Sequence, residues 1–145
     1  MIPKIDTVIG ISTYSTKFPR VSGKIKSSSD DFFVSEVLSK KILDTISEND
    51  GFSVYVLQKN GIDTTHALRD VEKRFGLVLN ALGLKDSTAV TNQYVQTRTK
   101  SKSLEKIEGK KYSLNRIGFS KKQISKQSML GNKFRIKISK QIGDI

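Results

Sequence analysis

Alternating hydrophobic and polar residues, together with short apolar runs, predict that most of this chain forms β-strands. Side chains along a strand point to opposite faces with a period of two, and stretches with this period recur through the sequence. The predicted strands span residues 21–26, 31–38, 52–58, 78–84, 89–97, 112–119 and 134–138. In the second of them Phe32, Val34 and Glu36 share one face, while the residues between them take the other. For residues 89–97 the pattern is also compatible with a helix.

One stretch has a clear helical period instead. Apolar residues recur at helical spacing from Ala67 to Phe75, and Gly76 ends the run. Asp63, Thr64 and Thr65 offer carboxylate or hydroxyl caps for the first turn. His66 lies in the first turn, where a histidine is more often a surface or capping side chain than a catalytic base. We therefore predict one main helix and assign His66 no catalytic role.

The remaining segments predict little regular structure. Residues 1–20 lack a sustained period and are expected to form an irregular arm, residues 101–108 predict one or two helical turns, and residues 120–129 form a basic connector. Gly131 and Asn132 predict a turn. The sum is an α+β fold in which a strand-dominated mixed or antiparallel sheet carries one main helix.

Charge adds a candidate partner, because the 145-residue chain has a formal net charge of +12 at pH 7. Residues 1–96 hold 12 Lys and Arg against 11 Asp and Glu, whereas residues 97–140 hold 14 against 2. A surface this basic attracts polyanions, so we expect the segment 98–140 to contact nucleic-acid phosphates. A lysine-rich face that is merely solvated is the alternative.

Other kinds of site are disfavoured by what the sequence lacks. It has no cysteine and a single histidine, so we expect no disulfide framework, no thiolate metal site and no zinc site. No apolar run approaches the roughly 20 residues that a membrane span needs, and the first 20 residues show no convincing secretory signal. The cytoplasm is therefore the expected compartment.

The stretch LGLKDSTAVTNQ, residues 82–93, raises the question whether Asp86 is a turn residue or a nucleophile. An aspartate at the end of a strand commonly caps a helix or stabilises a turn. An ionised aspartate can also act as a nucleophile, and the neighbouring Lys85 favours the ionised form. Taken alone, this stretch is compatible with both roles.

Three stretches, in this order along the chain, resemble the TruD family of tRNA pseudouridine synthases. They are residues 23–36 (GKIKSSSDDFFVSE), 83–93 (GLKDSTAVTNQ) and 130–138 (LGNKFRIKI). The family typically shows a lysine followed by P-x-D-F-x-V-x-E, then G-x-K-D with a basic residue and x-A-x-T-x-Q, and then G-N-x-F. Residues 58–77 are also similar to the family's segment in which an Asn- and Thr-containing turn opens a helix.

This resemblance implies that Asp86 is the catalytic aspartate, which acts on a uridine in tRNA without a cofactor. The uridine is expected in the D-arm region, and whether Asp86 attacks its ribose or its base stays open. The matching substrate-binding positions are Lys26, Phe32, Lys85, Asn132 and Phe134. Aromatic rings of this kind hold a base that has left its helix, although phenylalanines in strands usually belong to the core. Thr91 and Gln93 match as local scaffolding.

Two residues and the length depart from the family pattern. Ser29 stands where the family often has proline, and Ser87 replaces the basic residue expected after the catalytic aspartate. The second change is expected to weaken phosphate contact or stabilisation of the nucleophile. The family's Asn-Tyr-Phe-Gly region and its inserted domain are missing. Residues 1–145 are thus expected to form a single domain, a partial catalytic domain that resembles the N-terminal half of the family's catalytic fold.

A truncated fragment, a gene split into two polypeptides, and a degenerate descendant all explain such a partial domain. A TruD-like synthase is the leading hypothesis for function. The alternatives are a non-catalytic RNA-binding module and an unrelated basic structural or ribosome-associated domain, which would be favoured if Lys26 and Asp86 lay on opposite sides of the fold. An incomplete sheet exposes strand edges, so we also expect self-association or a second polypeptide that supplies the missing half.

Overall fold

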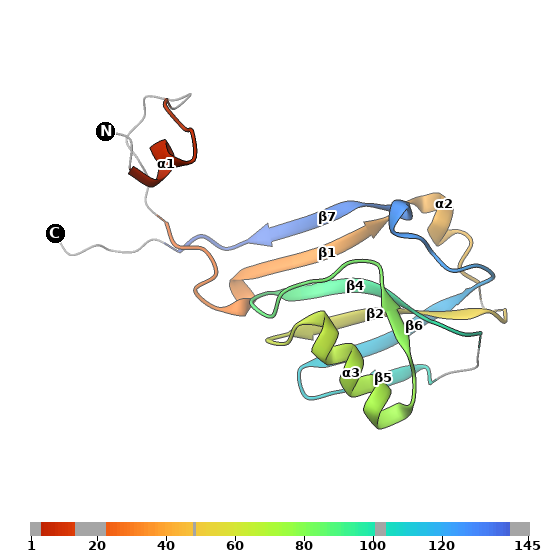
Figure 1. Ribbon diagram of the computed structural model, residues 1–145. Coiled ribbons are helices and arrows are strands. Elements are labelled where there is room, and N and C mark those ends of the chain that lie inside the picture. The colour runs from red at the N-terminus through yellow and green to blue at the C-terminus, as the bar shows by residue number, and fades with distance from the viewer. Residues whose placement is uncertain (1–3, 14–22, 48, 101–103, 140–145) are drawn as a thin grey trace.

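The computed structural model describes residues 4–13, 23–47, 49–100 and 104–139, which contain one seven-stranded sheet (Figure 1). The strands are β1 (Phe32–Leu38), β2 (Phe52–Asn60), β3 (Leu79–Ala81), β4 (Val90–Thr97), β5 (Lys106–Glu108), β6 (Tyr112–Ser120) and β7 (Met129–Ile136). The helices are α1 (Lys4–Val8), α2 (Lys40–Leu43) and α3 (Thr64–Phe75), with 3-10 turns at Ser29–Asp31 and Lys126–Ser128. Within these residues, no helix is long and apolar enough to cross a membrane.

The strands follow the order β5-β6-β2-β4-β1-β7, and β3 pairs with β4 beside this path. Only the contact between β1 and β4 is parallel, and the other pairings of the described strands are antiparallel. The predicted fold class is therefore confirmed: the sheet is mixed, strands dominate, and α3 is the one long helix among the described residues.

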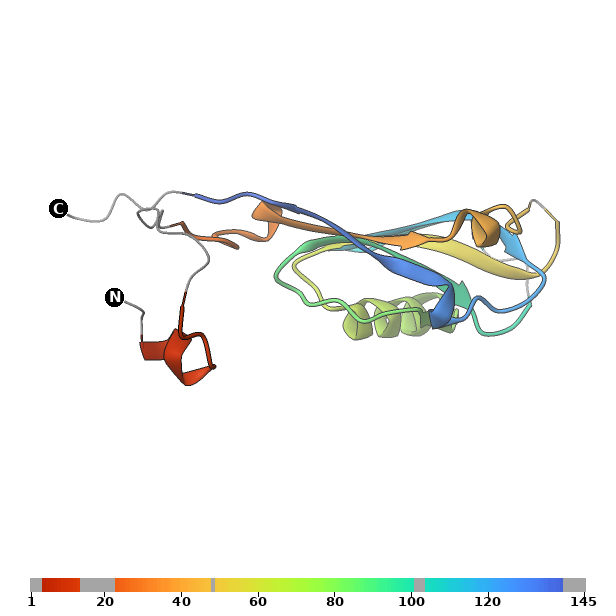
Figure 2. The same cartoon turned by 90° about the horizontal axis from the view of Figure 1, so that it is seen from above.

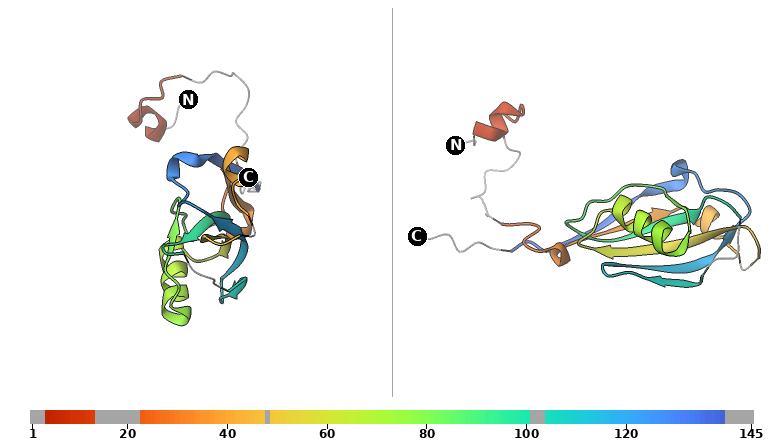
Figure 3. Two further views of the ribbon diagram at one scale, coloured as in Figure 1. Left: turned by 90° about the vertical axis from the view of Figure 1, so that its right-hand side faces the viewer. Right: turned by 60° about the horizontal axis from the view of Figure 1, so that its bottom comes forward.

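Helix α3 begins and ends where the sequence predicts. The side chain of Asp63 accepts a hydrogen bond from the backbone N–H of His66 at 2.9 Å and so caps the first turn. Gly76 ends the helix with φ of 66°, a left-handed conformation that glycine adopts without strain. Ala67 and Val71 form the buried stripe, which packs on one face of the sheet (Figures 2 and 3).

The core lies between α3 and the strands on the β5 side of the sheet. Its buried members are Tyr55, Leu57, Ala67, Val71, Leu79, Val95, Ile107, Tyr112 and Leu114. Burying a large apolar side chain stabilises the fold by about 1.5–3 kcal/mol, so these residues supply much of the folding free energy. A smaller cluster of Leu38, Val54, Leu82 and Ile124 lies where α2 and the segment before β7 meet the sheet.

Several local predictions are wrong, and pairing with distant strands explains two of them. Residues 106–108 form β5 rather than helical turns, because Ile107 is buried opposite Leu114 of β6. Gly131 and Asn132 do not form a turn: they continue β7, paired with Val37 and Glu36 of β1. In both places the hydrogen bonds of a neighbouring strand outweigh the local preference of the sequence.

The remaining differences concern the extent of an element. Residues 4–8 form the short helix α1 instead of an irregular arm, and the strand predicted over residues 78–84 is confined to β3. Of the strand predicted over residues 21–26, the structure shows only an isolated bridge between Lys24 and Ser139, and residues 21 and 22 lie outside the described residues.

Candidate active site

A row of paired residues crosses five strands, and its members on β4, β1 and β7 form the floor of the site. Lys59 of β2 pairs with Tyr112 of β6 and with Thr91 of β4, Thr91 pairs with Val34 of β1, and Val34 pairs with Phe134 of β7. Residues paired in this way point to the same face of a sheet. The sheet order therefore brings residues from sequence positions 34 to 134 under one surface.

A cavity of about 270 Å³ opens above the β4, β1 and β7 end of this row. The six residues that the sequence assigns to catalysis or substrate binding all line it, and they are Lys26, Phe32, Lys85, Asp86, Asn132 and Phe134. Lys26 and Asp86 thus lie around one cavity, which is the opposite of the placement expected for an unrelated domain. Asp86 itself is exposed.

Two phenylalanines and a lysine form one side of the cavity. The rings of Phe32 and Phe134 meet edge to face with centroids 6.0 Å apart, and the ammonium of Lys26 lies 4.3 Å from the centre of the Phe32 ring. Lys26 has φ of 55°, a conformation that costs a residue with a Cβ atom about 1 kcal/mol. Such strain persists where surrounding contacts fix the side chain, here the contact with Phe32.

A buried ion pair holds Lys85 in the cavity wall. Its Nζ lies 3.1 Å from Oε1 of Glu36, whose side chain is fully buried, and Oε2 of Glu36 accepts the backbone N–H of Tyr94 at 2.8 Å. Gly83 allows this pair to form, because a Cβ atom there would lie 3.0 Å from both Glu36 Oε1 and Lys85 Nζ. The glycine of the G-x-K-D motif therefore has a steric reason within this fold.

The start of α3 fixes the backbone that carries Asp86. The backbone N–H of Lys85 donates to Oγ1 of Thr64 at 2.9 Å, and the N–H of Thr64 donates to the carbonyl of Lys85 at 3.2 Å. The side chain of Gln93 donates to the carbonyl of Gly83 at 2.8 Å. These contacts hold the segment 83–86 against α3 and β4, although it has no strand or helix of its own.

Two residues that received no role from the sequence support this arrangement: Glu36, the last residue of the first motif, and Lys59, which precedes α3. Lys59 is 1% exposed, and its Nζ donates to the backbone carbonyl of Asp86 at 2.8 Å. Burial lowers the pKa of Lys59 to about 8, while the nearby carboxylates of Asp63 and Asp86 oppose this shift. Strand periodicity could have indicated that Lys59 is buried, because Lys59 follows Tyr55 and Leu57 at alternate positions, on the face that α3 covers.

Two polar residues near the site have contrasting surroundings. Oγ1 of Thr91 is buried at the cavity floor and has no hydrogen-bond partner among the described residues, although Thr91 itself lines the cavity. His66 pairs with Asp63 on the exposed start of α3 and does not line the cavity. The surface role expected for His66 agrees with this position.

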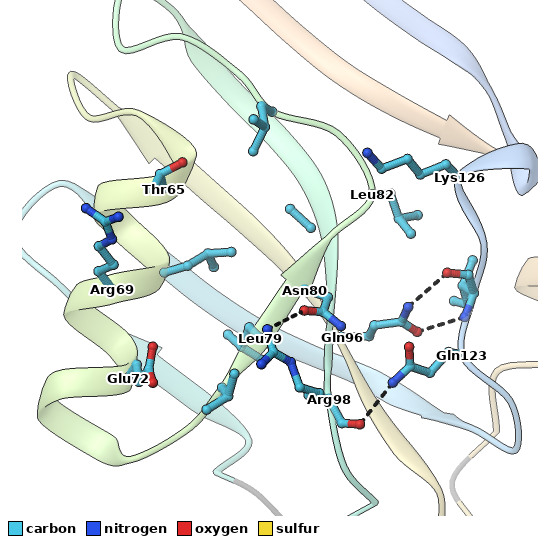
Figure 4. A pocket seen from close by; sticks show the side chains of 15 residues that line it. Thr65, Arg69, Glu72, Leu79, Asn80, Leu82, Gln96, Arg98, Gln123 and Lys126 are labelled. Carbon is cyan, nitrogen blue, oxygen red and sulfur yellow. Dashed lines mark hydrogen bonds between the residues drawn. The ribbon is translucent and has the colours of Figure 1, made fainter.

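A larger cavity of about 470 Å³ lies between α3, β3 and the segment before β7 (Figure 4). Arg69, Arg98 and Lys126 contribute positive charge to its lining, and Glu72 contributes a negative charge. Leu84 lines both cavities, so the two are neighbours. None of the six assigned residues lines the larger one.

Comparisons with known proteins agree with the fold and the motifs. A family model for tRNA pseudouridine synthase D (TruD) matches residues 8–144. Two proteins described as "Probable tRNA pseudouridine synthase D" are each 30% identical to this chain: the one from Archaeoglobus fulgidus over 90% of it and the one from Saccharolobus solfataricus over 94%. A crystal structure of TruD from Methanosarcina mazei superposes with a TM-score of 0.79 at 27% identity and covers 92% of this chain.

The chain belongs to the TruD family, and the resemblance seen in the sequence is confirmed. It spans about a third of the length of these relatives: 32% of the Archaeoglobus protein, 36% of the Saccharolobus protein and 30% of the Methanosarcina chain.

Proposed function

We propose that this chain carries the catalytic aspartate of a tRNA pseudouridine synthase, with Asp86 as the nucleophile. The observation that supports this most is the convergence of Asp86, two lysines and two phenylalanines from three separate segments on one cavity. A volume of about 270 Å³ suits a single base rather than a longer substrate. The family description names tRNA. Together with the D-arm location that the motif resemblance implies, this makes a uridine in the D-arm region of tRNA the proposed substrate.

The reaction moves the uracil ring from one glycosidic bond to another. The bond between N1 and C1′ breaks, the ring turns while it stays in the cavity, and a bond forms between C5 and C1′. The proton on C5 leaves to water and N1 takes up a proton, so the product is an isomer of uridine. Attack by the Asp86 carboxylate, on the ribose or on the base, provides a covalent intermediate that divides this rearrangement into easier steps. No electron is gained or lost, so the chemistry needs no redox cofactor.

The other cavity residues bind and orient the base. The target uridine must leave its helix, at an unstacking cost of about a few kcal/mol, and a ring such as Phe32 or Phe134 compensates by stacking. Phe134 is 55% exposed, which leaves its face available to a ligand. The amide of Asn132 can hydrogen-bond the polar edge of uracil, and the Lys26 and Lys85 ammonium groups lie close enough to the cavity to attract a nearby phosphate.

Two features suggest that this chain binds another polypeptide: it spans only about a third of its relatives' length, and one edge of the sheet is open. Among the described strands β7 has a neighbour on one side only, and Leu130 on it is 70% exposed. We propose that this edge pairs with a second polypeptide or a second copy of the chain, as expected from the sequence. Light scattering tests this: a monomer at all concentrations, with no binding to the C-terminal part of a TruD protein, would contradict it.

Release of tritium from tRNA labelled at uridine C5 tests the function. The assay uses the chain alone and the Methanosarcina mazei protein in which this chain replaces the matching segment. We expect release by the chimaera and a loss of about a thousandfold or more with Asp86→Asn. Equal release with asparagine would disprove the role of Asp86. No release by a folded chimaera that still binds tRNA would favour the non-catalytic RNA-binding alternative.

A further inference from the structure

We infer that Lys59 is a positioning residue, which fixes the backbone of Asp86 so that the carboxylate points into the cavity. This inference rests on the proposed function, and it assigns a role to a residue that lies outside the cavity lining. Lys59 does not touch the substrate in this account, because it acts through Asp86 from beneath.

The geometry makes Lys59 the deepest support of the Asp86 segment. Its side chain runs from the covered face of β2, is 1% exposed, and ends with Nζ 2.8 Å from the Asp86 carbonyl oxygen. The Thr64 contacts described above hold Lys85, one residue earlier. Among the described residues, Lys59 makes the side-chain hydrogen bond that reaches the Asp86 backbone itself.

The presence of a lysine at this place needs an explanation. Lys59 follows Tyr55 and Leu57 on the buried face of β2, and a buried ammonium is costly unless it is paired and hydrogen-bonded. A methionine would fill similar space without that cost. The cost in stability of burying Lys59 is explained if the position of Asp86, the candidate nucleophile, depends on this lysine.

The charges around Lys59 agree with a role in the site. The carboxylates of Asp63 and Asp86 attract its ammonium, and the ammonium of Lys85 repels it. Asp63 also caps α3 through the His66 backbone, so it is already fixed. Lys59 thus lies between the fixed start of the helix and the exposed aspartate, and it connects the position of Asp86 to the rigid part of the fold.

The first experiment uses NMR on the 145-residue chain and needs no activity. We expect the Lys59 ammonium protons to exchange slowly with water and to show a through-hydrogen-bond correlation to the Asp86 carbonyl carbon. Lys59→Met should shift the Asp86 carbonyl and Ser87 amide signals. Lys111→Met is the matched control, because Lys111 also donates to a backbone carbonyl, that of Gly61 at 3.3 Å, but is exposed and lines no part of the cavity.

The second experiment measures tritium release by the chimaera. Because misplacement of a catalytic group by about 1 Å can lower a rate about a hundredfold, we expect Lys59→Met to lower kcat by roughly 10- to 100-fold with little change in KM. Lys59→Arg, which keeps a charged donor, should restore part of kcat, and Lys111→Met should match the unaltered chimaera.

Either of two results would overturn the inference. One is a Lys59 ammonium that exchanges freely in the unaltered chain, a result that does not depend on whether any variant folds. The other is a folded Lys59→Met protein with unchanged kcat and unchanged Asp86 signals. A chimaera without activity would count against the proposed function, while the NMR result would still decide whether Lys59 holds Asp86.

Discussion

The part of the sheet that α3 covers and the part formed by β1 and β7 are built from the same kind of strand but differ in burial. In the covered part, Tyr55, Leu57 and Leu114 are completely buried. In the open part, Leu130 is 70% and Phe134 55% exposed. The covered part therefore supplies the stability, and the open part keeps apolar surface available at the cavity where a base must enter.

The two parts also place their paired carboxylates differently. In the covered part, Asp70 receives hydrogen bonds from Tyr112 and Arg74 at the surface. In the open part, the carboxylate of Glu36 is fully buried and bonded to Lys85. A buried pair is expensive to form, so its presence beside Asp86 indicates that the position of Lys85 matters more there than stability does.

The largest contrast should come from truncating one apolar side chain in each part. Leu57→Ala leaves a cavity in the core and should lower the free energy of unfolding by about 2–5 kcal/mol. Phe134→Ala should lower it by about 1 kcal/mol or less, because much of its ring is already in water, yet it should weaken binding of uridine nucleotides. Urea denaturation and nucleotide titration measure the two effects, and equal destabilisation would refute the division.

A smaller effect is expected from removing the buried negative charge. Glu36→Gln keeps an acceptor for the Tyr94 N–H but leaves the Lys85 ammonium without its partner, and should cost about 2–3 kcal/mol of unfolding free energy. The control is Glu108→Gln, which removes the ion pair between Glu108 and Lys106. Both side chains of that pair are exposed, so its loss should change the unfolding free energy by about 0–1 kcal/mol. If the two variants lost the same unfolding free energy, the buried pair would contribute no more to stability than the exposed one.

The smallest effect should appear only in acid. Hydrogen bonds from Tyr112 and then Arg74 hold the pKa of Asp70 below its usual range. Its contribution to stability is therefore complete above about pH 4, where the unfolded carboxyl is also ionised, and is lost as the pH falls through the lower folded value. The difference in urea midpoint between the unaltered chain and Asp70→Asn should be constant at neutral pH and shrink below pH of about 4.

Local patterns in the sequence predict most of this fold. The period of two along residues 31–38 places Val34 and Glu36 on the buried face, and Asp63 and Gly76 bound α3 as their capping preferences require. The predictions that failed, such as the turn at Gly131 and Asn132, concern residues whose conformation depends on a distant strand. The residues around Gly131 do not reveal by themselves that this segment pairs with β1, which lies about a hundred residues earlier in the chain.

The candidate site divides in the same way. Asp86 and the five binding residues came from motifs, which carry chemistry in short stretches of sequence. Glu36 and Lys59 take their roles from partners that are 49 and 27 residues away, Lys85 and Asp86. Periodicity placed Glu36 on a face that proved to be buried, whereas the strand predicted over residues 52–58 ended before Lys59. Which groups the two residues bond could not be known without the arrangement of the strands.

The most direct measurement of the central claim is an NMR titration of the 145-residue chain with uridine 5′-monophosphate. The account predicts the largest shifts at the amides of Lys85, Asp86 and Phe134, and their loss in Phe134→Ala. Largest shifts at Thr65, Leu79 and Gln123 around the larger cavity, or shifts spread evenly over the basic surface, would contradict it.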